Sequence, residues 1–147
     1  MRLYHYTTWA GEKMWFERVI KPSLRYGEWR ADAKENAWPR LTFLTINDFW
    51  DASVQTRSRD NHWEKCGSDP RAYRELGIPC WRFEVNPHTI VTGNPIEIKT
   101  DDDVWARMLL DAVRLGSNPH EWRITSQDAF IIGGWKWEKG EWVSRIN

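Results

Sequence analysis

The feature of this sequence that most constrains its fold is a succession of short segments rich in aromatic and β-branched residues, separated by turn-forming residues. Residues of these types suit the pleated, half-buried surface of a β-sheet. The segments cover residues 2–8, 41–46, 79–85, 89–92, 96–99, 121–125, 129–132 and, as a hairpin, 135–143. In the hairpin, Trp135 and Trp137 are expected to pair with Trp142 and Val143. The sequence therefore predicts six or seven short strands.

Fewer segments have helical character. They cover residues 9–20, 70–75 and 100–115, with a further short turn after Asn47. Thr8 is a suitable N-cap for the first helix, Pro70 suits the first turn of the second, and Gly116 closes the third. Residues 23–40 and 53–69 lack periodicity, and they predict two long loops. Strands and helices in this mixed order indicate a single α+β domain over residues 1–147.

Composition narrows the class of protein. The chain has 147 residues, enough for one core, and its 21 basic residues balance 21 acidic ones. A neutral chain implies no bulk attraction to nucleic acid or to a membrane. The chain has no run of 18 apolar residues, so we expect a soluble protein. It has only two cysteines, so we expect the reducing cytoplasm, with a single disulfide between them as the alternative.

Twelve tryptophans are unusually many for a chain of this length. Tryptophan buries a large area and carries an N–H that needs a partner. Most of these residues are expected in the core and at its rim. Several are expected to line a groove or a partner surface.

His5 lies in the middle of the first predicted strand. Alternation along the strand puts Leu3 and His5 on one face and Tyr4 and Tyr6 on the other. A buried imidazole needs a hydrogen-bond partner or a ligand, so His5 is either a satisfied core residue or part of a site. Other polar groups, Thr45 and Glu121, lie at the ends of apolar segments, where sites tend to be found.

Four motifs occur in an order that resembles a known family. They are Leu-Tyr-His-Tyr-Thr-Thr at residues 3–8, Val-Ile-Lys-Pro at 19–22, Cys-Trp-Arg-Phe-Glu-Val at 80–85 and Pro-His-Glu-Trp-Arg-Ile at 119–124. Together they resemble small ADP-ribosyltransferase-like proteins of bacteria and phages. The resemblance implies a split antiparallel β-sheet with a few flanking helices, which holds NAD as substrate in a central cleft.

The resemblance also implies roles for particular residues. His5 would hydrogen-bond the adenosine-side ribose, while the backbone at Tyr6 and Thr7 would hold the nicotinamide amide. Thr45 would line the nicotinamide pocket, with Phe43 or Trp50 as a stacking surface. Glu121 would bond the nicotinamide ribose and stabilise the oxocarbenium-like transition state, which a preorganised carboxylate in a dry cleft can do.

The sequence departs from the family pattern in two places. It has no Glu-x-Glu or Gln-x-Glu pair, and Gln127 and Asp128 lie six residues beyond the expected position. The central tyrosine of the His-Tyr-Glu class has no clear match, although Tyr73 is a candidate. The alternatives are therefore an NAD-dependent transferase acting on a macromolecule, and a catalytically silent module that binds a nucleotide or a protein.

Other groups of residues suggest different chemistry. Basic and aromatic residues share the two predicted loops, where they could hold the pyrophosphate of NAD or stack on nucleic-acid bases. They are Arg25, Arg30, Arg40, Arg57 and Arg59 with Tyr26, Trp29, Trp38 and Trp63. The set of His62, Cys66, Cys80 and His88 contains zinc-ligand types but lacks a CxxC spacing, and Asp101 to Asp103 lack the alternation of a calcium loop. No metal is expected.

Overall fold

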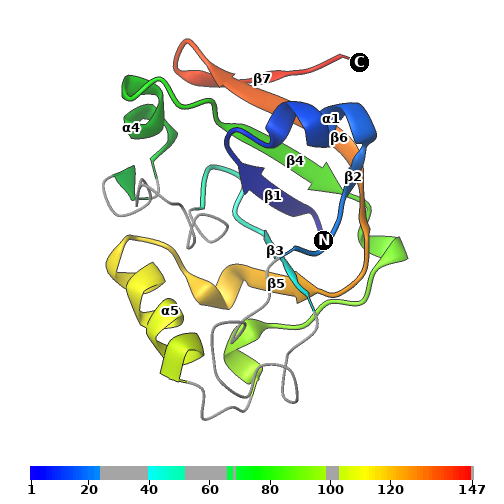
Figure 1. The fold of residues 1–147 in the computed structure, drawn as a ribbon, viewed down its shortest axis with the longest axis vertical. Helices are drawn as coiled ribbons and strands as arrows, with labels where there is room; N and C mark the ends of the chain where they lie inside the picture. The colour runs from blue at the N-terminus through cyan, green and yellow to red at the C-terminus, as the bar shows by residue number, and fades with distance from the viewer. Residues whose placement is uncertain (24–39, 52–65, 68, 99–102, 147) are drawn as a thin grey trace.

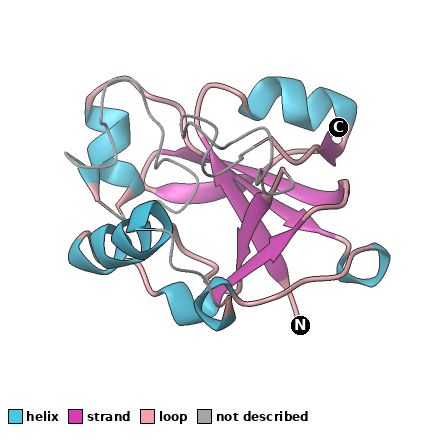
Figure 2. Ribbon diagram, turned by 60° about the horizontal axis from the view of Figure 1, so that its bottom comes forward, coloured by secondary structure: helices cyan, strands magenta, loops and turns pink. Residues whose placement is uncertain are grey.

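A computed structural model describes residues 1–23, 40–51, 66–67, 69–98 and 103–146, and it has an antiparallel sheet at its centre with helices around it (Figures 1 and 2). The strands are β1 (Leu3–Thr7), β2 (Val19–Ile20), β3 (Thr42–Thr45), β4 (Trp81–Val85), β5 (Trp122–Thr125), β6 (Ala129–Glu138) and β7 (Glu141–Ser144). Their order is β2-β6-β4-β1-β3-β5, and β7 also pairs with β6. The predicted α+β class is confirmed. No helix in the described ranges is long and apolar enough to span a bilayer.

Strand β1 lies between β4 and β3, so its side chains alternate between two covered faces. His5 is opposite Phe83 on β4, and Tyr4 is opposite Thr45 on β3. We call the side that carries Leu3, His5 and Thr7 the histidine face, and the side that carries Tyr4 and Tyr6 the tyrosine face. All five residues of β1 are buried, as expected for a strand covered on both sides.

Helix α1 (Gly11–Glu17) covers the histidine face. Met14 and Trp15 pack on the cluster that contains Phe83, and the Trp15 and Phe83 rings are stacked with centroids 6.2 Å apart. Gly11 permits this close approach, because a Cβ there would lie 2.1 Å from the Trp81 ring. The helix is therefore held firmly against β4.

Helices α4 (Pro70–Glu75) and α5 (Asp103–Arg114) belong to the clusters on the tyrosine face. One cluster gathers Tyr6, Trp50 and Tyr73, and the other gathers Phe43, Trp105 and Trp122. Aromatic rings meet edge to face in both, for example Trp50 with Tyr73 and Phe43 with Trp122. The predicted helix over residues 70–75 is confirmed, and the third predicted helix is described from Asp103 onward.

The prediction for the first helix was wrong at both ends. Its N-cap is Ala10, and Thr8 supplies only its backbone carbonyl, which accepts from the Gly11 N–H. At the other end, Arg18 adopts a left-handed conformation with φ of 62° and stops the helix. Val19 and Ile20, which are β-branched, then pair with β6 as β2.

Asn-Pro dipeptides begin three short 3-10 helices: η2 (Pro87–Thr89), η3 (Pro95–Glu97) and η4 (Pro119–Glu121). In each, the side chain of the preceding asparagine accepts the N–H two residues later, and proline supplies the φ that the turn needs. The strand predicted at residues 89–92 and the described part, 96–98, of the strand predicted at 96–99 were wrong, since these residues form 3-10 turns and irregular segments. After Asn47 the same local bonding makes a turn at Phe49 and no helix.

The C-terminal hairpin is confirmed, but Trp135 lies opposite Ser144 and Val143 opposite Lys136, so the expected pairing of Trp135 within the Trp142–Val143 pair was wrong. Trp137 pairs with Trp142, and their rings meet edge to face at 5.2 Å. The predicted segments 129–132 and 135–138 form one continuous strand, β6. Among the described tryptophans, Trp50, Trp81, Trp105, Trp122 and Trp137 are buried, whereas Trp9 keeps 69% of its surface exposed.

Candidate functional site

His5 is the polar centre of the histidine face. It is 7% exposed, and its Nδ1 lies 2.9 Å from the backbone oxygen of Phe43. A carbonyl oxygen only accepts, so Nδ1 carries the proton and donates it. Nε2 is then an unprotonated acceptor in the neutral ring, and it has no partner among the described residues.

The environment keeps this imidazole neutral. Burial lowers the pKa of His5 to about 4, and the hydrogen bond to Phe43 offsets only part of this effect. At neutral pH the ring therefore offers a lone pair and carries no positive charge. A ligand that donates an O–H or N–H matches it, and a ligand that needs a cation at this point does not.

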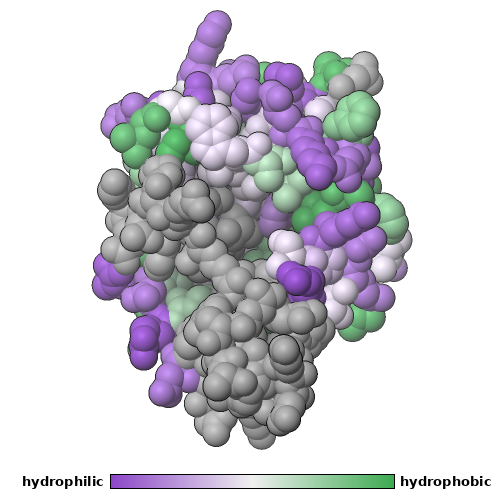
Figure 3. Space-filling model, in the orientation of Figure 1, coloured by the Kyte–Doolittle hydropathy of each residue, from purple (hydrophilic) through white to green (hydrophobic). Residues whose placement is uncertain are grey.

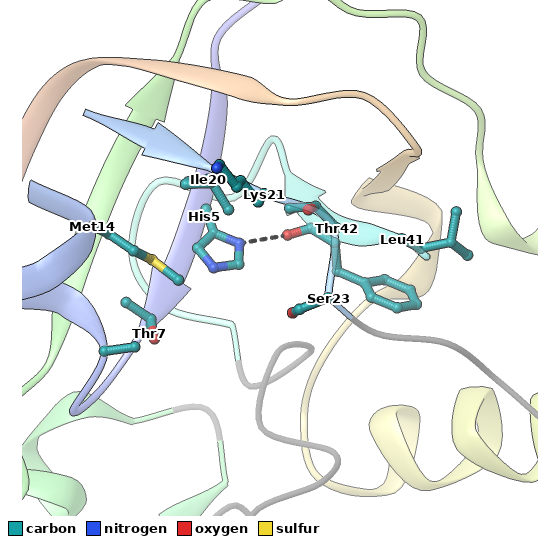
Figure 4. A pocket seen from close by; sticks show the side chains of 10 residues that line it. His5, Thr7, Met14, Ile20, Lys21, Ser23, Leu41 and Thr42 are labelled. Carbon is teal, nitrogen blue, oxygen red and sulfur yellow. Dashed lines mark hydrogen bonds between the residues drawn. The ribbon is translucent and has the colours of Figure 1, made fainter. Parts of the chain in front are cut away.

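A cavity of about 300 Å³ opens beside His5 (Figure 4). The second ring nitrogen faces the space between Thr7, Met14 and Ser23 in this view. The wall combines residues from β1, α1, β2 and β3 with the segment that follows β2. They are His5, Thr7, Ala10, Met14, Ile20, Lys21, Ser23, Leu41, Thr42 and Phe43. Among these residues Lys21 supplies a positive charge and none supplies a carboxylate.

Thr42 has a second polar atom that makes no hydrogen bond to the described residues. Its Oγ1 is buried and has no hydrogen-bond partner among the described residues. The antiparallel register places Thr42 opposite Thr7, on the histidine face. Two polar groups of residues in the cavity wall, Nε2 of His5 and Oγ1 of Thr42, thus have no bond to the described residues that a ligand would first have to break.

Three of the predicted site residues meet in this cavity, namely His5, Thr7 and Phe43. Phe43 contributes through its backbone carbonyl, because its ring packs against Trp105 and Trp122 on the tyrosine face. A stacking role for the Phe43 ring in this cavity therefore does not fit the structure.

Other predicted site residues lie on the tyrosine face, away from the cavity. The Tyr6 hydroxyl donates to the Asn47 carbonyl at 2.6 Å, and Thr45 Oγ1 accepts from the Asn47 N–H at 3.0 Å. The Trp50 ring contacts Tyr6 and Tyr73 in the same aromatic cluster. Burial raises the pKa of both tyrosines. These side chains act as packed structural groups, and Tyr73 does not face His5.

Glu121 is not part of the cavity wall. It ends η4, is half-buried, and its carbonyl accepts from the Ile46 N–H at 3.0 Å, just beyond the end of β3. Strand β5, which begins at the next residue, is separated from β1 by β3. Glu121 lies beside the end of β3 that carries Thr45, because Thr45 pairs with Trp122. The cavity lies at the other end of β3, at Thr42. Arg57 lies outside the described residues.

Sequence reasoning missed Asp51, the most deeply buried carboxylate in the described ranges. It is fully buried and accepts from Ser117 Oγ and from Trp122 Nε1, both at 3.0 Å. These bonds join the segment after β3 to the end of α5 and to β5. A single aspartate after Phe49 and Trp50 belongs to no repeating pattern from which its burial could be predicted. Lys21, in contrast, could have been found by following the motif at residues 19–22, whereas Thr42 joins His5 only through the register between β1 and β3.

The cysteines and histidines of the described ranges form no metal centre. No group of three or more His, Cys, Asp or Glu side chains lies together in that part of the chain. Cys66 and Cys80 are both buried thiols, and burial raises the pKa of the Cys80 thiol to about 12. A thiol in this state is a poor nucleophile. His62 lies outside the described residues.

Comparisons with protein-family models, with curated proteins and with solved structures found no match to this chain.

Proposed function

We propose that this protein is an ADP-ribosyltransferase-like module that binds NAD or a related nucleotide in the His5 cavity. The observation that carries the proposal is the neutral, buried imidazole with a free acceptor nitrogen at the wall of a cavity. A ribose hydroxyl or a carboxamide N–H is the natural donor to such a nitrogen.

The other wall groups fit the same ligand class. Thr42 can bond to a second hydroxyl or to an amide, Met14 and Ile20 offer apolar surface to a flat ring, and Lys21 can pair with a phosphate. About 300 Å³ is near the lower end of ligand pockets, so the cavity holds one end of a dinucleotide.

Binding without turnover is the function that the wall chemistry favours. Cleaving the glycosidic bond lets nicotinamide leave with the bonding electrons, and the ribose becomes transiently cationic. A carboxylate close to this centre would stabilise it, and the described residues of the cavity wall offer a lysine and neutral groups instead. The silent module is therefore our first candidate.

Transfer of ADP-ribose is the second candidate, because of the strand order. Strand β5, which follows Glu121 directly, pairs with β3, whose residues Thr42 and Phe43 are part of the cavity wall. A ligand that extended from the cavity along β3 would approach Glu121. In that case an acceptor nucleophile would bond to C1′ of the ribose and lose its proton.

Calorimetric titration with NAD, ADP-ribose and nicotinamide tests the binding. His5→Asn keeps a side-chain donor for the Phe43 carbonyl but removes the Nε2 acceptor, and we expect affinity to fall by about tenfold or more. His88→Asn, which changes an exposed histidine, is the matched control. If none of the three ligands binds, or if both variants bind equally well, the proposal is wrong.

Release of nicotinamide, measured on the same samples, separates the two candidates. Wild-type protein that binds NAD and leaves it intact is the silent module. Turnover that Glu121→Gln lowers by about two orders of magnitude would establish the transferase instead. Turnover that this variant leaves unchanged would remove Glu121 from the mechanism.

A further inference from the structure

Besides the His5 cavity, two further cavities lie on the other side of α1. Their volumes are about 290 and 300 Å³, and both are bounded by Glu12 and Trp81. Met14 of α1 and the N-cap Ala10 line the His5 cavity, whereas Glu12 lines both of the other cavities, and Trp15 and Phe16 line one of them. Figure 1 shows α1 beside β6 and the C-terminal hairpin, which supply the other walls.

Cations dominate the walls of these cavities. Arg18 and Arg145 border one, and Arg74 and Lys136 border the other, against the single carboxylate of Glu12. This is a local excess of positive charge on a protein whose net charge is zero.

Aromatic rings hold several of these cations in place. The Arg18 guanidinium lies 3.3 Å from the centre of the Trp15 ring, and Lys136 and Arg145 lie 5.4 and 5.6 Å from that of Trp81. Arg145 also approaches Glu138 at 3.8 Å on the exposed surface. A ring face stabilises a cation without neutralising it, so these groups keep their charge and their N–H donors for a ligand.

Two large aromatic side chains stand exposed at the rim. Trp9 is 69% exposed and Phe16 is 88% exposed. The surrounding top of the molecule, over α1 and β7, is mostly hydrophilic in Figure 3. Two separate exposed rings do not make a continuous apolar surface of the kind that binds another protein. Each ring instead offers a flat surface for stacking beside a positive charge.

We propose that this surface, formed by Trp9, Phe16, Arg18, Arg74, Lys136 and Arg145, binds single-stranded nucleic acid. The cations would contact successive phosphates, and the exposed rings would stack on bases. Unpaired bases fit this arrangement, because the bases of a duplex already stack on each other and cannot cover an exposed ring. The site is separate from the His5 cavity and does not depend on the function proposed for it.

Fluorescence polarisation with a labelled oligothymidylate of about 12 nucleotides tests this proposal, since the length covers a typical single-strand site. We expect the double variant Arg18→Gln/Arg145→Gln to bind at least about tenfold more weakly. The slope of log affinity against log salt should become shallower by about 0.7 for each phosphate that the variant no longer neutralises.

The aromatic half of the surface has its own variant. Trp9→Ala/Phe16→Ala should weaken binding several-fold while leaving the salt slope unchanged, because stacking involves no counterion release. Lys13→Gln is the matched control: Lys13 lies on the same helix, is paired with Glu17 and is outside both cavities. Thermal melting of each variant confirms that it is folded.

Three results would overturn the proposal. One is no binding of the oligonucleotide at low salt by folded wild-type protein. Another is an equal fall in affinity in Lys13→Gln, which would make the effect one of total charge. The third is binding of heparin or polyglutamate as tight as that of the oligonucleotide, with no effect of Trp9→Ala/Phe16→Ala, which would indicate a general polyanion surface.

Discussion

The polar side chains of strands β1 and β3 are bonded differently on the two faces of β1. On the tyrosine face, the hydroxyls of Tyr6 and Thr45 both bond to the backbone of Asn47, and Asp51 accepts from Ser117 and Trp122. On the histidine face, His5 Nε2 and Thr42 Oγ1 have no partner among the described residues and border a cavity. The tyrosine face also holds buried polar atoms without a partner among the described residues, Trp50 Nε1 and Tyr73 Oη, so what distinguishes the histidine face is the cavity beside His5.

This contrast matters because both faces are equally buried. Leaving a buried polar atom without a partner costs free energy, so a stable protein usually satisfies all of them. Thr42 Oγ1 is such an atom in a residue of the cavity wall, so stability is lower than it could be there, and a ligand that bonded to it would recover the difference. The comparison therefore separates side chains that hold the fold from side chains that are available for binding.

The largest expected effect is on the tyrosine face. Asp51→Ala removes an acceptor shared by Ser117 and Trp122, and we expect the free energy of unfolding to fall by about 4 kcal/mol, since bonds to a charged group are each worth about 1.5–3 kcal/mol. Urea denaturation measures the change. Asp128→Ala, which alters an exposed aspartate, should leave stability within about 0.5 kcal/mol of wild type. Equal effects of the two variants would refute the structural role of Asp51.

An intermediate effect is expected in the pH dependence of the free energy of unfolding, through His5 on the histidine face. The unfolded chain binds a proton at His5 below pH 6.5, whereas the folded protein does so only below about pH 4. Stability due to neutral His5 is therefore complete above pH 6.5, falls as the pH drops toward 4, and is constant below that. The decrease reaches about 3 kcal/mol.

Unfolding measured from pH 7 to pH 4 on wild type and His5→Asn isolates this contribution. The stability of wild type relative to the variant should decrease as the pH falls through this window. His88→Asn should follow wild type throughout, because His88 is exposed. A difference between wild type and His5→Asn that stays constant with pH would mean that His5 is not held neutral by burial.

The smallest effect compares the two threonines directly. Thr42→Val removes a hydroxyl without a described partner, and it should stabilise the protein by about 1 kcal/mol. Thr45→Val removes the acceptor of the Asn47 N–H, and it should destabilise by a similar amount, about 1 kcal/mol. Thermal and urea unfolding of the pair give the sign of each change. Two changes of the same sign would remove the distinction between the faces.

Much of the sheet could be predicted from the sequence, because β1, β3, β4 and the terminal hairpin combine β-branched and aromatic residues with alternation or turn signals. The predictions for the segments after Asn86 and Asn94 were wrong. Their apolar residues suggested strands, but local bonding from each asparagine and the fixed φ of the following proline favoured 3-10 turns. Local side-chain bonding outweighed the apolar pattern at both places.

The candidate site could be predicted only in part. Alternation separated Leu3 and His5 from Tyr4 and Tyr6, and the structure has them on opposite faces of β1, with His5 at the cavity. It could not show that Thr45 belongs to the opposite face, because that depends on the register between β1 and β3. Nor could it show that the cavity extends away from Glu121. These facts follow from pairing between distant segments, which a single sequence does not encode locally.

The central position of β1 has a consequence for how the molecule assembles. Leu3 pairs with Val85, so the middle of the sheet joins residues that are 82 positions apart. Contacts this distant in sequence slow folding, because a long stretch of chain must be ordered before they form. During synthesis β1 emerges before either of its neighbouring strands and cannot complete its ladder until β4 has left the ribosome. We therefore expect a late, cooperative closure of the sheet, in which the strand that bears His5 is locked in place only when more than half of the chain has been made.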